Sequence, residues 1–168
     1  MNLEFDESGV RTMSKITITR KGFDELLFNA LTAVYAFERD KVNRFELSYG
    51  QIYLLQLLRR QTPSRMSDIA YRMGMPVSTA TRFVAKMEKM HFLERIKDES
   101  DRRAILVSLN DKGKKAVKAV EDHSFSILSS NLKDFPKDDI DAFMKTAKCL
   151  DKILSTRSRN KDAANTGK

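Results

Sequence analysis

The sequence predicts a mainly α-helical (α+β) protein with about six helices and one small β-hairpin. Three observations support this fold class. Apolar residues recur every three or four positions over long stretches, which is typical of amphipathic helices. A Gly-Met-Pro turn separates two short helical segments, and two alternating strand-like segments follow them. Because two short helices, a tight turn and a hairpin occur in this order, we expect a winged helix-turn-helix.

The length and composition favour one globular domain, or one domain with a short accessory unit, in the cytoplasm. No apolar run in the 168 residues approaches the roughly 20 needed to span a membrane. The first residues, MNLEFDESG, are acidic and polar, whereas a signal peptide is basic and then apolar. The single cysteine, Cys149, excludes an internal disulfide, and too few Cys and His residues are present for the usual zinc site. We expect no metal and no cofactor.

The excess positive charge is concentrated in the middle third of the sequence. Residues 59–118 contain 15 Lys or Arg and 7 Asp or Glu, so this segment alone accounts for the net charge of +8. The rest of the chain is neutral. An evenly spread excess would indicate only a solvated basic surface, but localised positive charge is typical of a nucleic-acid-binding surface. This favours a nucleic-acid partner.

Three helices are predicted before the central turn. Residues 21–45 form a long amphipathic helix, and residues 48–60 form a second one, with Ser48 as a plausible N-cap. The QTPS stretch then breaks the chain. A short helix over residues 67–73 follows, and its Ile69 and Ala70 are expected to face inward.

The central turn leads into the helix that we expect to carry function. Gly74 suits the left-handed residue that ends a helix, and Pro76 suits the first turn of the next. Residues 76–90 are then helical. The expected buried face consists of Ala80, Phe83, Val84, Met87 and Met90. The opposite face consists of Val77, Ser78, Thr81, Arg82 and Lys86.

A hairpin of strands at residues 92–97 and 104–109 comes next, followed by helices over residues 111–132 and 138–155, with a break at Pro136. Cys149 is expected to be a small buried residue of the last helix. The terminal helices carry more apolar surface than one winged helix can cover. The simplest partner is a second copy of the chain, because twofold dimers are the commonest oligomers.

These predictions divide the chain into a flexible N-terminal arm, dimerisation helices at both ends of the fold, a DNA-binding lobe between them and a disordered tail. The corresponding ranges are 1–20 for the arm, 21–47 and 111–155 for the dimerisation helices, 48–110 for the winged helix-turn-helix lobe, and 156–168 for the tail.

Residues 75–114, MPVSTATRFVAKMEKMHFLERIKDESDRRAILVSLNDKGK, resemble the MarR family (multiple antibiotic resistance regulators) of bacterial transcription factors. They contain a Ser-Thr-rich recognition helix, a wing with a D-x-R core and a V-x-L-x-x-x-G exit. With the flanking helices, the resemblance covers about residues 21–155. It implies a homodimer that binds a pseudo-palindromic operator in double-stranded DNA. It also implies a repressor that is released by a small, often aromatic, anionic effector.

One position departs from the family pattern. Family members commonly have glycine at the exit of the recognition helix, where this chain has His91. Glycine adopts a positive φ without steric cost, and histidine does so less easily. We therefore expect the end of this helix to differ slightly.

The recognition helix and its neighbours supply the predicted DNA contacts. Residues with donors and acceptors suited to base edges in the major groove are Ser78, Thr79, Thr81 and Arg82. Arg82 is the best candidate for a bidentate contact with guanine. Basic residues expected to contact phosphates, which add affinity without sequence information, are Lys86, Arg65, Arg72 and Arg95.

The predicted wing tip contains three further candidates. A wing is narrow enough for the minor groove, where negative potential favours arginine. The resemblance gives this role to Arg103, with Asp101 orienting its guanidinium through a charge-assisted hydrogen bond. Arg102 is expected either to contact DNA or to pair within the lobe.

Aromatic residues near the contact of the first two helices are candidates for an effector pocket, and packing in the core is their alternative role. They are Phe23, Phe28, Tyr49 and Tyr53.

Two other functions are alternatives to DNA binding. A winged helix could instead dock an acidic protein partner. An enzyme has little support, because the sequence contains no Ser-His-Asp, Cys-His or Gly-rich phosphate-binding pattern.

Overall fold

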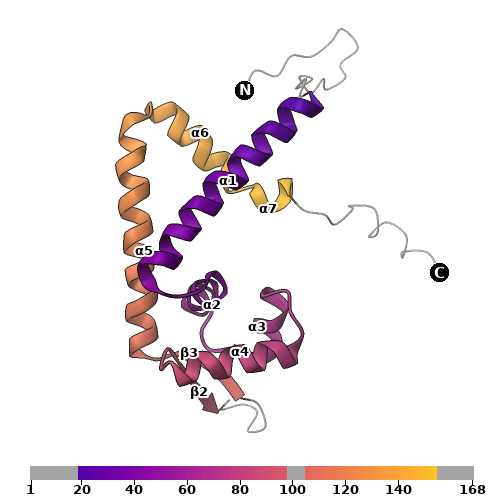
Figure 1. Cartoon of the computed structure of the whole chain (residues 1–168), viewed down its shortest axis with the longest axis vertical. Helices are drawn as coiled ribbons and strands as arrows, with labels where there is room; N and C mark the ends of the chain where they lie inside the picture. Colours follow the sequence, from indigo (N-terminus) through magenta and orange to yellow (C-terminus); the bar gives the residue numbers. More distant parts are fainter. Residues whose placement is uncertain (1–18, 98–104, 155–168) are drawn as a thin grey trace, which may run out of the picture. The chain divides into compact units, whose positions relative to one another are not determined.

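The computed structural model describes residues 19–97 and 105–154 (Figure 1). Most of the predicted arm (residues 1–18), the predicted tail and residues 98–104 lie outside the described residues. The chain divides into two compact units, one up to Val117 and one from Lys118. We describe each unit by itself.

The first unit contains the elements of the predicted lobe together with the first helix. Its helices are α1 (Arg20–Phe45), α2 (Tyr49–Arg60), α3 (Met66–Arg72) and α4 (Val77–Lys89). Its strands are β1 (Ser64–Arg65), β2 (Leu93–Lys97) and β3 (Ile105–Leu109). All predicted helices and both hairpin strands of this region are found within one or two residues of their expected bounds.

The three strands form an antiparallel sheet in the order β1-β3-β2. In the hairpin, Leu93 is opposite Leu109 and Lys97 is opposite Ile105. Strand β1 pairs Ser64 with Val107 on the other edge of β3. This strand was not predicted, because two residues are too few to show an alternating pattern.

Helix α2 begins with the predicted cap. The Ser48 backbone N–H donates to Gln51 Oε1 at 2.8 Å, and the Gln51 backbone N–H donates to Ser48 Oγ at 3.4 Å, which together form a capping box. Gln51 is itself buried, and its Nε2 donates to Met90 Sδ at 3.3 Å. The start of α2 is therefore tied to the end of α4.

The core of the first unit lies where α2, α3, α4 and the sheet meet. Its fully buried side chains include one row on α2 and the inner faces of α3, α4 and β3. They are Ile52, Leu54, Leu55, Leu58, Ile69, Ala80, Val84, Met87, Val107 and Leu109. The predicted inward positions Ile69 and Ala70 are confirmed. On α4, Phe83 and Met90 are only half-buried, so the buried face is narrower than expected.

The second unit contains most of α5 (Asp111–Asn131), the 3₁₀ turn η1 (Leu132–Asp134), α6 (Lys137–Ala147) and α7 (Leu150–Ile153). One continuous helix was predicted over residues 138–155, and this prediction is wrong. The Thr146 hydroxyl donates to the Ala142 carbonyl at 3.1 Å, a bond that tends to bend helices. The Cys149 N–H then donates to the Thr146 carbonyl, three residues earlier in the chain, and α6 ends at Ala147.

Large apolar side chains remain exposed on helices of both units. On α1 they are Phe23, Leu26, Phe28, Leu31, Val34 and Tyr35. On α6, α7 and the residue after α7 they are Phe143, Met144, Leu150, Ile153 and Leu154. Cys149 is also exposed, so its predicted burial is wrong for the single chain. Among the described residues, no helix is long and apolar enough to cross a membrane.

Candidate nucleic-acid interface

Helix α4 has two chemically different faces. Ala80, Val84 and Met87 are fully buried, and successive turns bring them to one side of the helix. The opposite positions, Ser78, Arg82 and Lys89, are exposed. Thr81 and Lys86 flank them, and they are exposed too. The fold therefore presents a polar and basic helix face to solvent, as the sequence predicted.

The local sequence explains where α4 begins. Gly74 has a φ of +62°, the left-handed conformation that was expected at this turn. Pro76 is the N-cap of α4, one residue earlier than its expected place in the first turn. The Thr79 and Ala80 N–H groups both donate to the Pro76 carbonyl at 3.0 Å. The Thr81 hydroxyl donates to the Val77 carbonyl at 2.8 Å, so only its oxygen lone pairs remain for a ligand.

The other end of α4 turns at His91, which has a φ of +60°. The N–H of His91 bonds to the Glu88 carbonyl at 2.8 Å, and the N–H of Phe92 bonds to the Met87 carbonyl at 3.0 Å. These bonds close the helix in the way that a glycine usually does at this position. The histidine departs from the family pattern in residue type but keeps the backbone conformation.

The segment after the hairpin holds this turn in place. Asn110 Nδ2 donates to the His91 carbonyl at 2.9 Å, and Lys112 Nζ donates to the Met90 carbonyl at 2.9 Å. Gly113 packs so closely that a Cβ there would lie 2.1 Å from the Phe92 carbonyl oxygen. The V-x-L-x-x-x-G exit therefore ends in glycine because no side chain fits against this turn.

An ion pair fastens the hairpin to α4. Arg95 Nε on β2 lies 3.0 Å from both carboxylate oxygens of Glu88 on α4, and a terminal nitrogen lies 2.9 Å from Glu88 Oε2. This bidentate geometry is the strong form of an Arg–carboxylate contact. Arg95 thus joins the wing strand to the recognition helix, and its expected phosphate contact stays a prediction.

Two basic residues of the exposed α4 face differ from Arg95. Arg82 and Lys86 make no side-chain hydrogen bond or ion pair within the described part of the chain. Their charges are therefore not neutralised by any of the described residues. Thr79 is half-buried and lies nearer the edge of this face.

The remaining predicted contacts lie away from the centre of α4. Arg65 is on β1 and is the residue before α3, and Arg72 ends α3; both are exposed. Asp101, Arg102 and Arg103 lie outside the described residues, in the segment that joins β2 to β3.

A cavity of about 560 Å³ lies between α1 and α2. Its lining is mostly apolar and consists of Leu31, Val34, Tyr35, Glu38, Arg39, Val42, Ser48 and Tyr49. Of the four predicted effector residues only Tyr49 lines it. Tyr53 stacks on Tyr49, with ring centroids 6.3 Å apart, while Phe23 and Phe28 are exposed elsewhere on α1.

Both charged residues of this cavity already have partners. Arg39 lies over the Tyr35 ring, 5.9 Å from its centroid. Glu38 pairs with the buried Lys41, whose Nζ also lies 4.9 Å from the centre of the Phe37 ring. The cavity therefore offers mainly apolar and aromatic surface to a ligand.

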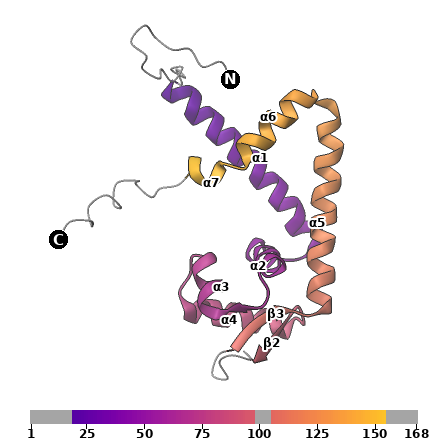
Figure 2. The same ribbon diagram turned by 180° about the vertical axis from the view of Figure 1, so that it is seen from behind.

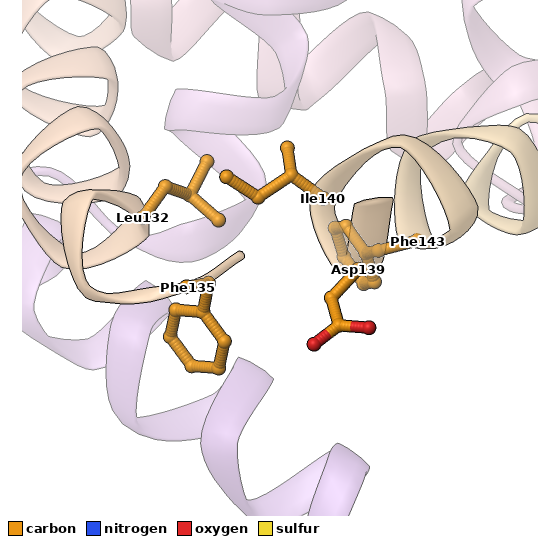
Figure 3. A pocket seen from close by; sticks show the side chains of 5 residues that line it. All are labelled: Leu132, Phe135, Asp139, Ile140 and Phe143. Atoms are coloured by element: carbon orange, nitrogen blue, oxygen red, sulfur yellow. The ribbon is translucent and has the colours of Figure 1, made fainter. Parts of the chain in front are cut away.

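A second apolar cavity, of about 370 Å³, lies within the second unit (Figure 3). Leu132 and Phe135 line one side of it. Ile140, Asp139 and Phe143 of α6 line the other side. No cluster of three or more His, Cys, Asp or Glu side chains able to hold a metal ion is found among the described residues.

Several residues that shape the interface were not predicted from the sequence. Gln51, Asn110 and Lys112 each make a polar contact with the end of α4. The pairing of Glu88 with Arg95 was also missed. Gln51 and Asn110 had a local signal in the sequence, because Gln51 fits a capping box with Ser48 and Asn110 precedes a helix. The Lys112 and Glu88 contacts had none, because they depend on the tertiary fold.

The winged-helix part of the chain is similar to a known protein family. Residues 47–105 match the model of the MarR family. The chain is also 25% identical over 134 residues to the HTH-type transcriptional regulator YfiV of Bacillus subtilis, which covers 80% of this chain and 84% of that protein. The middle of the chain is therefore similar to the MarR family, and the relative it matches is a transcriptional regulator.

Solved structures similar to this chain confirm the predicted fold. A MarR family protein from Bacillus stearothermophilus has a TM-score of 0.73 at 20% identity, covering 85% of this chain and 99% of that one. Streptococcus pneumoniae FabT, in a complex with DNA, has a TM-score of 0.69 at 16% identity, covering 81% and 97%. The mainly helical winged helix-turn-helix architecture is therefore shared with this family.

Proposed function

We propose that this chain is a MarR-family regulator and a sequence-specific repressor that binds a pseudo-palindromic operator in double-stranded DNA as a homodimer. The observation that carries the proposal is the exposed face of α4. It combines hydroxyl groups at Ser78 and Thr81 with the internally unpaired cations of Arg82 and Lys86. A helix of this kind fits the major groove, where these groups reach base edges and phosphates.

The distribution of charge supports the same partner. All of the net charge of +8 belongs to residues 59–118, which include α3, α4 and the hairpin. Relatives support it as well, since FabT and a mutant of Staphylococcus aureus MepR were solved with DNA or an oligodeoxyribonucleotide. Ser78, Thr79, Thr81 and Arg82 are the proposed base-reading residues. Lys86, Arg65, Arg72 and Arg95 are the proposed phosphate contacts, and Asp101, Arg102 and Arg103 are the proposed wing contacts.

The exposed apolar side chains support a homodimer. Monomeric proteins rarely expose contiguous apolar patches larger than a few hundred Å². Helix α1 exposes a stripe that includes Leu26, Leu31 and Val34, and α7 exposes Leu150 and Ile153. A second copy of the chain would bury these residues and would place two α4 helices on a two-fold operator.

The cavity between α1 and α2 is the proposed effector site. Its volume of about 560 Å³ lies within the roughly 300–1,000 Å³ usual for sites of small organic ligands. Because Glu38 and Arg39 are already engaged, an aromatic body would be recognised mainly through Tyr49, Tyr35 and the aliphatic lining. Binding there would release the repressor from DNA.

Selection of bound sequences from a random duplex pool tests DNA binding, half-site spacing and specificity together. We expect an enriched palindrome with half-sites about one helical turn apart. With about 6–10 phosphate contacts, affinity should fall roughly 10³- to 10⁵-fold between 50 and 200 mM salt. Binding without preference over random competitor DNA would contradict the proposal and favour a module that docks an acidic protein.

Substitutions on α4 test the assignment of residues on the selected operator. We expect Arg82→Ala to weaken binding about 5- to 150-fold and to relax specificity at one base position. Lys86→Ala should weaken binding to all sequences and lower the salt slope by about 1. Arg44→Ala, which removes an exposed charge at the end of α1, is the control and should leave affinity unchanged.

Sedimentation tests the homodimer. Leu26→Asp on α1 and Ile153→Asp on α7 should each convert the chain to a folded monomer, because a charge in an apolar interface is costly. Ile105→Asp changes an equally exposed apolar residue of the wing strand and should leave the dimer intact. A monomeric wild-type chain would overturn this part of the proposal.

A further inference from the structure

A small cavity within the first unit, between α2 and α3, has a lining unlike that of the other two cavities. Its volume is about 210 Å³, and it is lined by Tyr53, Gln56, Leu57, Arg60 and Arg72. Four of these residues come from α2, and the fifth ends α3. The lining thus combines two guanidinium groups, a phenol and an amide with one aliphatic side chain.

The spacing of the sequence explains why these groups meet. Residues 53, 56, 57 and 60 are three or four apart, so they lie on one face of α2. Arg72 lines the same cavity from the end of α3, which follows α2 after the short β1 strand. Helix C-termini favour cations, and both Arg60 and Arg72 occupy last turns.

Among the described residues, none balances the positive charge of this cavity. No carboxylate is among its described lining residues. Within the described part of the chain, neither Arg60 nor Arg72 makes a side-chain hydrogen bond or ion pair. Two like charges around one cavity repel each other, and an anion between them would remove that repulsion. Guanidinium groups bind carboxylates and phosphates through paired N–H donors.

We propose that this cavity is a binding site for a small oxyanion, namely a carboxylate or phosphate group of a low-molecular-weight ligand. Arg60 and Arg72 supply the charge and the paired donors, and Gln56 and Tyr53 supply further polar groups. The volume lies below the usual range for drug-sized ligands, so the site fits a single anionic group with a small body. The inference does not depend on the proposed binding of DNA.

The position of α2 favours a free anion over a phosphate of bound DNA. Helix α2 contacts the inner side of α4, since a Cβ on Gly50 would lie 3.4 Å from the Phe83 ring and Gln51 bonds to Met90. Ser78 and Arg82 lie on the other side of α4. Figures 1 and 2 show α2 above α4 and the hairpin in both views. A duplex on the exposed face of α4 would therefore be separated by that helix from the α2 residues of the cavity. Arg72, at the end of α3, is also a proposed phosphate contact, so the comparison with operator binding below uses Arg60.

The cavity is also distinct from the proposed effector site. Tyr49 lines the cavity between α1 and α2, and Tyr53 lines the anion site, with the two rings stacked. The tyrosine pair thus forms a common boundary between an apolar cavity and a basic one. An anion that moves the Tyr53 ring would change the wall of the neighbouring cavity.

Calorimetric titration of the full chain without DNA tests the proposal. Inorganic phosphate and benzoate are the two probes, in a phosphate-free buffer at constant ionic strength. We expect one site per chain for at least one probe, and the stronger probe tells whether phosphate or carboxylate is preferred. Arg60→Gln and Arg72→Gln should each weaken binding about tenfold or more. The matched control Arg44→Gln should bind as the wild type does.

Two further measurements keep the result interpretable. Circular dichroism should show unchanged folding of the variants, since both arginines are exposed, and Arg72→Lys should retain part of the affinity because it keeps the charge. Operator affinity in anion-free buffer should be the same for wild type and Arg60→Gln. The proposal is overturned if neither probe binds, if the variants bind as tightly as wild type, or if the variants lose operator affinity while no free anion binds.

Discussion

Helices α1 and α2 have the same kind of apolar periodicity, yet they are packed very differently. Six of the 12 residues of α2 are buried, whereas Lys41 is the one buried residue among the 26 of α1. Helix α2 lies against strand β3 and contacts α4 at Phe83 and Met90. The stripe of α1 remains uncovered in the single chain. An apolar period therefore predicts that a helix has a buried face, but not which molecule buries it.

The largest expected effect is the loss of stability when a core leucine of α2 is truncated, compared with truncation of an exposed leucine of α1. Leu58→Ala should destabilise the chain by about 2–5 kcal/mol, because it leaves a cavity in the core. Leu26→Ala should change the urea midpoint only at concentrations where the dimer forms. Urea unfolding at several protein concentrations measures both. Equal, concentration-independent losses would mean that α1 is covered within its own chain.

Two glycines extend the comparison to backbone packing. Gly113→Ala should destabilise by about 1–3 kcal/mol, since the new Cβ would collide with the Phe92 carbonyl. Gly22→Ala on α1 should be neutral or stabilising by up to about 1 kcal/mol, because its Cβ would meet only the Thr19 side chain at 3.1 Å. Thermal unfolding of the two variants distinguishes these outcomes. A tolerated alanine at position 113 would contradict the close packing at the end of α4.

Two described residues other than glycine, Glu46 and His91, have a left-handed backbone conformation, and each lies at the end of a helix. His91→Gly at the end of α4 should stabilise by up to about 1 kcal/mol, because glycine adopts this φ without steric cost. Glu46→Gly, where φ is +54°, makes the same change at the end of α1. Chemical denaturation of each variant gives the effect. A loss of stability at position 91 would show that the histidine side chain contributes contacts of its own.

The smallest expected effect concerns ion pairs. A double-mutant cycle on Glu88 and Arg95 should give a coupling of about 0.5–1 kcal/mol, near the upper end for pairs at a protein surface. The pair of Arg20 and Asp24 on α1 is far more exposed and its atoms are 3.9 Å apart, so its coupling should be near zero. Unfolding free energies at low salt give both values. Equal coupling energies for the two pairs would contradict the interpretation that the Glu88–Arg95 pair holds the hairpin against α4.

The exposed residues of α4 were predictable because they depend on local rules. Helical spacing separates Ala80, Val84 and Met87 from Ser78 and Arg82, whatever the rest of the fold does. The end of this helix was expected to differ slightly because His91 stands in place of glycine, but His91 adopts the positive φ that glycine favours. The charge of residues 59–118 needed only counting.

Other parts of the site required contacts between residues distant in sequence. No pattern indicated that Arg95 would pair with Glu88, or that Arg60 and Arg72 would line one cavity. Strand β1 could not be predicted from the sequence, because its two residues form a strand only through their pairing with β3. The end of α6 at Ala147 was missed because no glycine or proline marks it.

The sequence by itself determined the order of the elements, the polar face of the recognition helix and the concentration of positive charge, because these follow from spacing and composition along the chain. The tertiary structure decided which apolar faces were covered, which cations stayed unpaired and which side chains met around each cavity. These properties depend on the packing of elements far apart in the sequence, and periodicity carries no information about partners.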